Sequence, residues 1–257
     1  MCLIVFAWRA DRRFDLVLAA NRDEFFRRPS APAAYWRDHP HVLGGQDLEK
    51  GGGWLGISTG GRWAAVTNYR EPAREKQGRS RGLLVREYLI HDTAPEDWIG
   101  SLAVSGHEYP GFSLLAGDRY QLHYVCNRSP ASIVVTPGVH GLSNHLLDTP
   151  WPKVVHAKTE LETALRLDES GLVEALFGML ADRRRARDED LPATGVSLEW
   201  ERALSAPFIE TPDYGTRAST VLIVRADGSV RFEERSFGPG GVEIGRARYA
   251  FDAPRLV

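Results

Sequence analysis

The cysteine directly behind the initiator methionine is the residue of this chain with the clearest chemical potential. Removal of Met1 would make Cys2 the N-terminal residue, with a thiol to attack a carbonyl carbon and its own α-amine to accept the thiol proton. The unperturbed pKa of an α-amine is about 8, so a neutral amine is available close to neutral pH. Cys2 could equally be a small apolar residue that opens a buried strand, and its position alone does not separate the two interpretations.

Polar and charged residues follow a second apolar stretch, Phe14–Ala20, in an order that would bring them to Cys2. If this stretch pairs with the apolar run that begins at Cys2, an antiparallel hairpin places Asn21, Arg22 and Asp23 at the same end of the sheet. The Asp23 carboxylate could then orient the α-amine, and Arg22 could hold a carboxylate or favour the thiolate. The alternative is that these residues end a strand and form ion pairs at the surface.

Two asparagines, one arginine and one tryptophan stand at the ends of other expected strands. Asn68 and Asn144 each follow a strand region, and a neutral Asn side chain is a good donor to an oxyanion. Arg217 precedes an apolar strand, where it could project a permanent cation into a cleft. Trp54 could line an apolar substrate pocket. Turn chemistry would also explain the asparagines, a surface ion pair the arginine, and a core position the tryptophan.

The elements that must position these residues can be read from the spacing of apolar side chains. We expect strands at Cys2–Trp8, Phe14–Ala20, Trp54–Ser58, Trp63–Asn68, Phe112–Ala116, Tyr120–Cys126, Ser132–Thr136, Ser219–Arg225 and Val230–Arg235. We expect helices at Ser80–His91, Pro95–Ala103, Pro152–Leu167 and Glu169–Arg184, and a loop at Asn21–Pro40. This order favours an α+β fold of antiparallel sheets covered by helices, and no linker divides residues 1–257 into separate domains.

Composition and charge exclude several other classes of protein. The 257 residues carry 32 Lys and Arg against 34 Asp and Glu, so a net charge of −2 offers no basic excess to a nucleic acid. Two cysteines cannot supply a disulfide scaffold, and no apolar run approaches the roughly 20 residues of a membrane span. The first residues lack the order of a secretory signal, so we expect a cytoplasmic protein. His39 and His41 alone do not make a metal site, and Cys126 is expected to be buried and inert.

Several spaced motifs together resemble the NRDE family, also called the transport and Golgi organisation protein 2 family. They are Met1-Cys2, Asn21-Arg22-Asp23-Glu24, Gly44-Gly45-x-Asp47, Gly53-Trp54-Leu55-Gly56, Thr67-Asn68-Tyr69-Arg70, Leu142-Ser143-Asn144 and Tyr214-Gly215-Thr216-Arg217-x-Ser219-Thr220. The resemblance covers nearly the whole chain. It implies the fold of the N-terminal-nucleophile hydrolases, a four-layer αββα sandwich, and eukaryotic members of the family are linked to Golgi organisation, lipid metabolism and haem trafficking.

A more distant resemblance is to the cysteine N-terminal hydrolases that cleave bile-salt and penicillin amides. By motif position, it implies that Cys2 is the nucleophile and that the Asp23 carboxylate orients the amine. It further implies that Asn68 and Asn144 are oxyanion donors and that Arg217 is an electrostatic cation. The hydrolases carry a further Arg three residues before the Asp, where this chain has Ala20. Arg22 stands next to the Asp instead, so the resemblance departs at this position.

Two hypotheses about function follow from these residues. The first is an N-terminal cysteine hydrolase that cleaves a non-peptide amide or acyl bond of a small molecule and needs no cofactor or metal. The second, suggested by Ala20 and by the aromatic loops, is a non-catalytic carrier of haem, acyl-CoA or another lipid on the same fold. A scaffold in a protein complex is a third interpretation with no feature specific to it, and the oligomeric state stays open.

Overall fold

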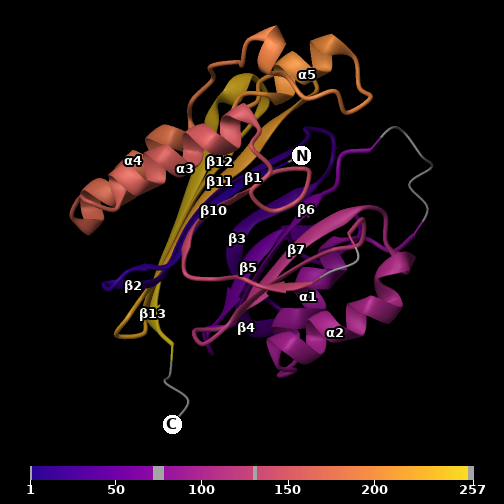
Figure 1. Cartoon of the computed structure of the whole chain (residues 1–257). Coiled ribbons are helices and arrows are strands. Elements are labelled where there is room, and N and C mark those ends of the chain that lie inside the picture. Colours follow the sequence, from indigo (N-terminus) through magenta and orange to yellow (C-terminus); the bar gives the residue numbers. More distant parts are fainter. Residues whose placement is uncertain (1, 72–77, 130–131, 254–257) are drawn as a thin grey trace.

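The computed structural model describes residues 2–71, 78–129 and 132–253, and its strands form two antiparallel sheets that stack face to face (Figure 1). The first sheet has the order β10 (Gly138–Leu142), β1 (Cys2–Asp11), β2 (Phe14–Phe25), β11 (Tyr214–Arg225), β12 (Ser229–Phe237) and β13 (Glu243–Asp252). The second has the order β3 (Ser30–Trp36), β4 (His39–Asp47), β5 (Leu55–Ser58), β6 (Trp63–Asn68), β7 (Phe112–Gly117), β8 (Leu122–Cys126) and β9 (Ile133–Val134).

Helices cover the outer face of each sheet (Figure 1). The first sheet is covered by α3 (Pro152–Ala164) and α4 (Glu169–Leu180), and the second by α1 (Gly82–Ile90) and α2 (Pro95–Ser105). A short helix, α5 (Leu198–Leu204), lies at the end of the sandwich where β1 begins. The expected four-layer αββα arrangement is therefore confirmed. None of the helices among the described residues combines the length and apolar character required to cross a membrane.

Three apolar layers hold the sandwich together, and side-chain alternation along the strands builds them. Ile4 and Phe6 of β1 point into the core between the two sheets, where the Phe6 ring meets Trp63 edge to face with centroids 6.4 Å apart. Leu3 and Val5 of the same strand point the other way, against α3 and α4. Both faces of β1 are thus buried, which explains why the strand is a continuous apolar run in the sequence.

Most of the expected strands and helices are confirmed, but the expected loop at Asn21–Pro40 is wrong. β2 continues through its polar residues to Phe25, and β3 and the start of β4 occupy most of the remainder. The polar end of β2 stays in the sheet because Asn21 and Asp23 find partners from distant parts of the chain. Besides β3 and β4, the elements β10, α5 and β13 were also not expected. β13 is an edge strand of the first sheet, and most of its residues are exposed. Its sequence therefore shows only a weak apolar pattern.

Candidate active site

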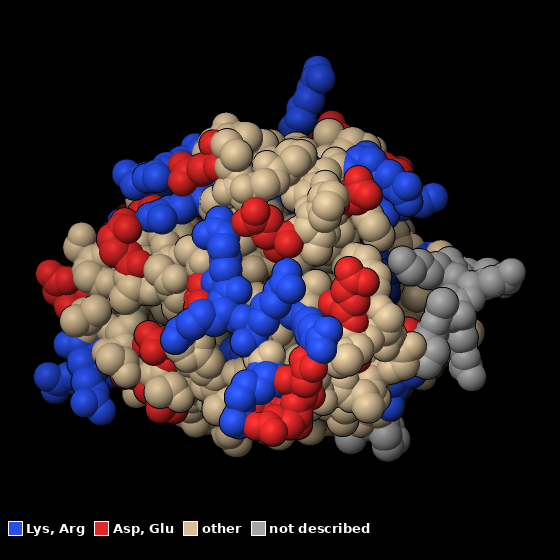
Figure 2. Space-filling model, turned by 90° about the horizontal axis from the view of Figure 1, so that it is seen from above, with Lys and Arg blue, Asp and Glu red and all other residues tan. Residues whose placement is uncertain are grey.

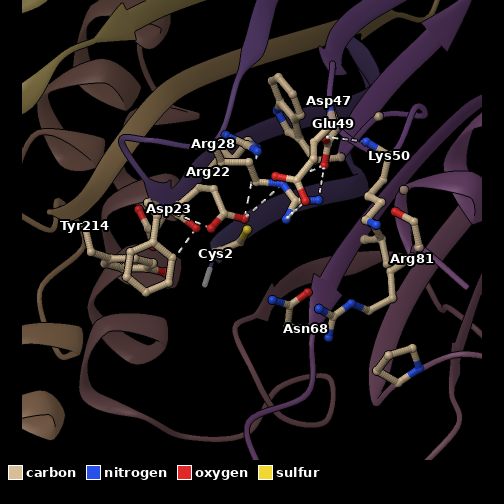
Figure 3. Close-up of a pocket in the computed structure, with 18 of the residues that line it drawn as sticks. Cys2, Arg22, Asp23, Arg28, Asp47, Glu49, Lys50, Asn68, Arg81 and Tyr214 are labelled. Atoms are coloured by element: carbon tan, nitrogen blue, oxygen red, sulfur yellow. Dashed lines mark hydrogen bonds and ion pairs between the residues drawn. The ribbon is translucent and has the colours of Figure 1, made fainter. Parts of the chain in front are cut away.

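Between the sheets, a cavity of about 680 Å³ opens where β1 begins and β2 ends (Figure 3). Its wall is built by the ends of β1, β2, β4 and β6, the segment before α1, and α5. The lining residues are Cys2, Arg22, Asp23, Glu24, Phe25, Arg27, Arg28, Asp47, Glu49, Lys50, Gly53, Trp54, Val66, Asn68, Gly78, Arg79, Ser80, Arg81, Gly82, Pro110, Trp200 and Tyr214. Five predicted site residues therefore share one cavity: Cys2, Arg22, Asp23, Trp54 and Asn68.

Cys2 and Arg22 are direct partners in the β1–β2 ladder. Both project from the sheet face that carries Ile4 and Ala20, which is the face toward the second sheet. The Arg22 side chain is buried, and its guanidinium carbon lies 4.4 Å from the centre of the Trp54 ring. The Arg that the hydrolases carry at the position of Ala20 is absent here, but Arg22 lies two residues further along the same face. A cation is thus retained beside the thiol.

Burial raises the pKa of the Cys2 thiol above its ordinary value, and the negative charge of Asp23 raises it further. The positive charge of Arg22 opposes this effect and lowers the pKa of the same thiol. Because the balance leaves the pKa raised, the thiol carries its proton at neutral pH. Nucleophilic attack by Cys2 therefore requires a base within reach of the sulfur.

Asp23 is held on the opposite face of β2, toward the helices. Its carboxylate oxygen Oδ1 accepts a hydrogen bond from the Thr216 hydroxyl at 2.7 Å, and its main-chain carbonyl accepts one from the Tyr214 hydroxyl at 3.0 Å. Burial raises the pKa of this carboxyl above its ordinary value, and the charges of Lys153 and Arg22 offset only part of this effect. Asp23 also reaches the cavity wall at the end of the strand (Figure 3).

Asn144 connects Cys2 to Asn68. The main-chain nitrogen of Cys2 donates to Asn144 Oδ1 at 3.4 Å, and Asn144 Nδ2 donates to the main-chain carbonyl of Asn68 at 2.9 Å. The neighbouring Ser143 hydroxyl donates to the Cys2 carbonyl at 3.0 Å. Asn144 is fully buried and lies behind the cavity wall, whereas the side chain of Asn68 faces the cavity across from Asp23 (Figure 3).

Arg217 and Asn21 are directed away from this cavity. Arg217 lies at a bulge of β11, between Thr216 and Ala218. Its Nη1 donates to the carbonyls of Phe25, Phe26 and Arg28 at 3.0, 3.3 and 3.1 Å. Arg217 lines an adjoining cavity of about 540 Å³, which shares Arg22 and Trp54 with the first. The Asn21 amide donates to the carbonyls of Leu180 and Pro207 at 2.8 and 2.9 Å. Both side chains hold the surrounding backbone.

Six basic and four acidic side chains line the cavity, and most of the basic ones were not singled out in the sequence. Figure 2 looks down on this end of the molecule and shows basic and acidic side chains side by side around the centre of the face. Arg81, just before α1, is partly buried and donates to the Gly111 carbonyl at 3.1 Å. Arg28 pairs with Asp47 at 2.6 Å. No group of three or more His, Cys, Asp or Glu side chains within the described residues is arranged to hold a metal.

Residues 1–239 match the model of the family described as Transport and Golgi organisation 2. The chain belongs to this family. Curated Transport and Golgi organisation 2 relatives agree: a Bos taurus homolog is 38% identical over 92% of this chain and 93% of its own length. The Homo sapiens homolog is 37% identical over the same shares, and the Drosophila melanogaster protein is 27% identical over 92% of each chain. The family resemblance of the motifs is confirmed.

Solved structures that are similar to this chain include two enzymes. A mutant conjugated bile acid hydrolase from Clostridium perfringens superposes with a TM-score of 0.52 at 9% identity, over 98% of this chain and 92% of the other. An N-acylethanolamine-hydrolyzing acid amidase ortholog from Caenorhabditis elegans superposes with a TM-score of 0.53 at 13% identity, over 86% of this chain and 92% of the other. At these identities the likeness establishes the N-terminal-nucleophile hydrolase fold alone.

Proposed function

We propose that this protein is an N-terminal cysteine hydrolase that cleaves a non-peptide amide or related acyl bond of a small molecule. One observation carries the proposal: Cys2 faces a cavity of about 680 Å³ with Arg22 opposite it in the ladder, while its main-chain nitrogen lies against Asn144. In a chain that has lost Met1, this nitrogen is the α-amine. The raised pKa of the thiol is consistent with a mechanism in which that amine serves as the base.

The first half of the reaction forms an acyl-enzyme. The neutral α-amine of Cys2 takes the thiol proton while Sγ bonds to the carbonyl carbon, and the carbonyl oxygen becomes an oxyanion. The Asn68 side chain, which faces the cavity, donates to this oxyanion. The tetrahedral intermediate then collapses: the carbon–nitrogen bond breaks, the α-ammonium gives its proton to the leaving amine, and a thioester on Cys2 remains.

The second half of the reaction restores the enzyme. Water attacks the thioester carbon and gives a proton to the α-amine. The carbon–sulfur bond then breaks, the thiolate takes this proton back from the α-ammonium, and the carboxylic acid leaves. The hydrogen bonds of Asn144 support a role in holding the amine and the Asn68 backbone, rather than the oxyanion role that motif position implies. Asp23 would orient the amine from the helix side of the strand.

The mechanism requires that Met1 is removed, and Met1 lies outside the described residues. Mass spectrometry of the purified protein therefore tests the proposal. We expect the purified protein to begin at Cys2 and to carry an acyl adduct on Cys2 when quenched during turnover of a panel of N-acyl amides. Cys2→Ala should abolish turnover and adduct. Cys126→Ala, which removes the buried cysteine of β8, is the matched control and should retain both. An intact Met1, or full turnover by Cys2→Ala, would overturn the mechanism.

A second candidate function is a carrier of haem or of acyl-CoA or another lipid, and the raised pKa of the Cys2 thiol favours it. A protonated thiol beside a cavity that mixes aromatic and basic side chains could serve binding without chemistry. Haemin titration followed by absorbance, and calorimetry with an acyl-CoA, separate the two functions. Tight binding that Cys2→Ala leaves unchanged, without thiol-dependent turnover, would favour the carrier.

We place this activity in the cytoplasm. Cys2 and Cys126, the two cysteines of the chain, are both free thiols, which suits a reducing compartment. Cell fractionation of the tagged protein tests the location.

A further inference from the structure

Lys153, in the first turn of α3, is a buried lysine. Only 3% of the residue is exposed, and its Nζ has no hydrogen-bond partner within the described part of the chain. Removing an ammonium group from water is unfavourable unless other charges compensate for it. Burial accordingly lowers the pKa of Lys153 to about 8. A lysine at this position therefore reduces stability, and its presence requires an explanation beyond packing.

Strand alternation places the Asp23 carboxylate in the same layer as Lys153. Asp23 shares a face of β2 with Ala19 and Asn21, and this is the face that packs against the helices. Only 2% of Asp23 is exposed. The next residue of α3, Val154, packs in that same layer. The negative charge of Asp23 raises the pKa of Lys153, and the positive charge of Lys153 lowers the pKa of Asp23.

Other titratable groups surround Lys153 from each neighbouring element. Cys2 of β1 and Glu201 of α5 raise its pKa, and Arg70, beyond β6, lowers it. Arg70 and Glu201 are bound to each other at 2.6 Å. On the outer side, a shallow surface hollow is lined by Lys153, and there Asp182 pairs with His156 at 3.2 Å and with Arg184 at 2.7 Å. The acidic side chain of this hollow, Asp182, is thus engaged by His156 and Arg184, which leaves Asp23 as the principal counter-charge of Lys153.

We propose that Lys153 is a positioning residue that favours the ionised form of the Asp23 carboxylate behind Cys2. Arg22 supplies positive charge to Asp23 from the layer between the sheets, and Lys153 supplies it from the layer under α3. Without Lys153, burial would shift Asp23 further toward its protonated, neutral form. The inference rests on the proposed function in one respect only: an ionised Asp23 is what would hold and orient the α-amine of a processed Cys2.

Titration of Asp23 by ¹³C NMR tests this inference without any substrate. The protein is labelled at the aspartate carboxyl carbons, and the Asp23 resonance is assigned by its loss in Asp23→Asn. In Lys153→Met, which keeps the length of the side chain, we expect the pKa of Asp23 to rise by about one unit or more. Lys158→Met is the matched control, since it removes a more exposed ammonium from the same helix, and should leave the Asp23 titration unchanged.

The wild-type protein supplies a second readout. The Asp23 resonance should show a step near pH 8 as Lys153 loses its proton, and this step should disappear in Lys153→Met. Lys153→Arg, which preserves the charge, should keep the Asp23 pKa close to that of the wild type. An Asp23 titration that neither responds near pH 8 nor changes in Lys153→Met would overturn the inference. These results do not depend on turnover, so a failure of the hydrolase proposal would be seen separately.

Discussion

At the scale of single residues, one pairing in the β1–β2 ladder gives the N-terminal cysteine its surroundings. Arg22 is opposite Cys2 and on the same face of the sheet as Ala20, because residues two apart in a strand share a face. The departure from the hydrolase pattern therefore changes where the cation is attached but keeps it next to the thiol. Asp23, one residue further, necessarily faces the other layer.

Arg22→Gln tests the electrostatic role of this pairing. The variant removes the cation that lowers the pKa of the Cys2 thiol, so we expect that pKa to rise by about one unit. At pH values below the pKa, the rate of alkylation of Cys2 should then fall about tenfold. The pH dependence of iodoacetamide labelling, followed by mass spectrometry, measures it. Arg27→Gln, at the exposed rim of the same cavity, is the control. Equal profiles for Arg22→Gln and the wild type would rule out the effect.

Glu234 of β12 predicts a pH dependence of stability. The Ala33 amide and the Thr220 hydroxyl donate to its carboxyl at 2.7 and 3.2 Å, and burial raises its pKa from 4.5 to about 7. The folded protein thus binds this proton more tightly than the unfolded chain. The stabilisation that this proton provides is fully present below the pKa that Glu234 has in the unfolded chain. It is lost as the pH rises through the pKa of Glu234 in the folded protein, and the free energy of unfolding falls by up to about 3 kcal/mol.

Glu234→Gln keeps an acceptor for Ala33 and removes the titration. We expect its free energy of unfolding to exceed that of the wild type at pH above about 7 and to vary less with pH between about 5 and 8. Urea denaturation at a series of pH values measures both quantities. Glu160→Gln, at an exposed position of α3, is the control and should show the same change of unfolding free energy with pH as the wild type. A Glu234→Gln curve parallel to that of the wild type would contradict the prediction.

At the scale of elements, an ion pair attaches α5 to the end of the second sheet. Arg70, which follows β6, meets Glu201 of α5 at 2.6 Å, and both side chains are almost completely buried. The Arg70 guanidinium also lies over the Trp151 ring at 4.6 Å, just before α3. This contact brings together three segments that are far apart in the sequence, and α5 contributes Trp200 to the cavity wall.

Glu201→Gln should therefore loosen α5. Removing one charge from a buried pair leaves Arg70 less well compensated, and we expect the free energy of unfolding to fall by about 3 kcal/mol. Hydrogen exchange should increase in residues 198–204 before the rest of the molecule responds. Glu199→Gln on the exposed side of the same helix is the control. An unchanged exchange pattern in Glu201→Gln would show that other contacts hold this helix.

At the scale of the whole molecule, the core between the sheets joins the two halves of the sandwich. Strands of both sheets contribute to one continuous apolar layer, in which Phe6 of the first sheet meets Trp63 of the second. The candidate site opens between the same two sheets, so its geometry depends on how they stack. We therefore propose that residues 1–257 form a single cooperative domain.

Calorimetry of Phe6→Ala tests this proposal. Truncation of a buried Phe leaves a cavity in the shared layer, and we expect a loss of about 3–5 kcal/mol and one transition at a lower Tm. Val155→Ala, on the exposed side of α3, should leave the Tm almost unchanged. Two separate transitions, with only one of them shifted, would show that the sheets unfold independently.

Local sequence determined the elements that bury a regular apolar pattern. The hairpin that begins at Cys2, the strand pair around residues 54–68 and four helices follow from spacing alone, because each pattern reports a period that the backbone imposes. The spaced motifs also indicated the family and, through it, the αββα fold. Cys2, Arg22, Asp23, Trp54 and Asn68 were expected near one another and share a cavity.

Only the tertiary structure decided which polar side chains meet. The end of β2 stays in the sheet because Thr216 and the Leu180 carbonyl satisfy its buried polar groups, and these partners lie more than 150 residues away. Arg217 turns to the backbone carbonyls of the β2–β3 connection because a bulge accompanies it in β11. Lys153 carries no local signal of burial at all. The free energy of a buried charge depends on partners from distant segments, and those partners become neighbours only when the sheets and helices have packed.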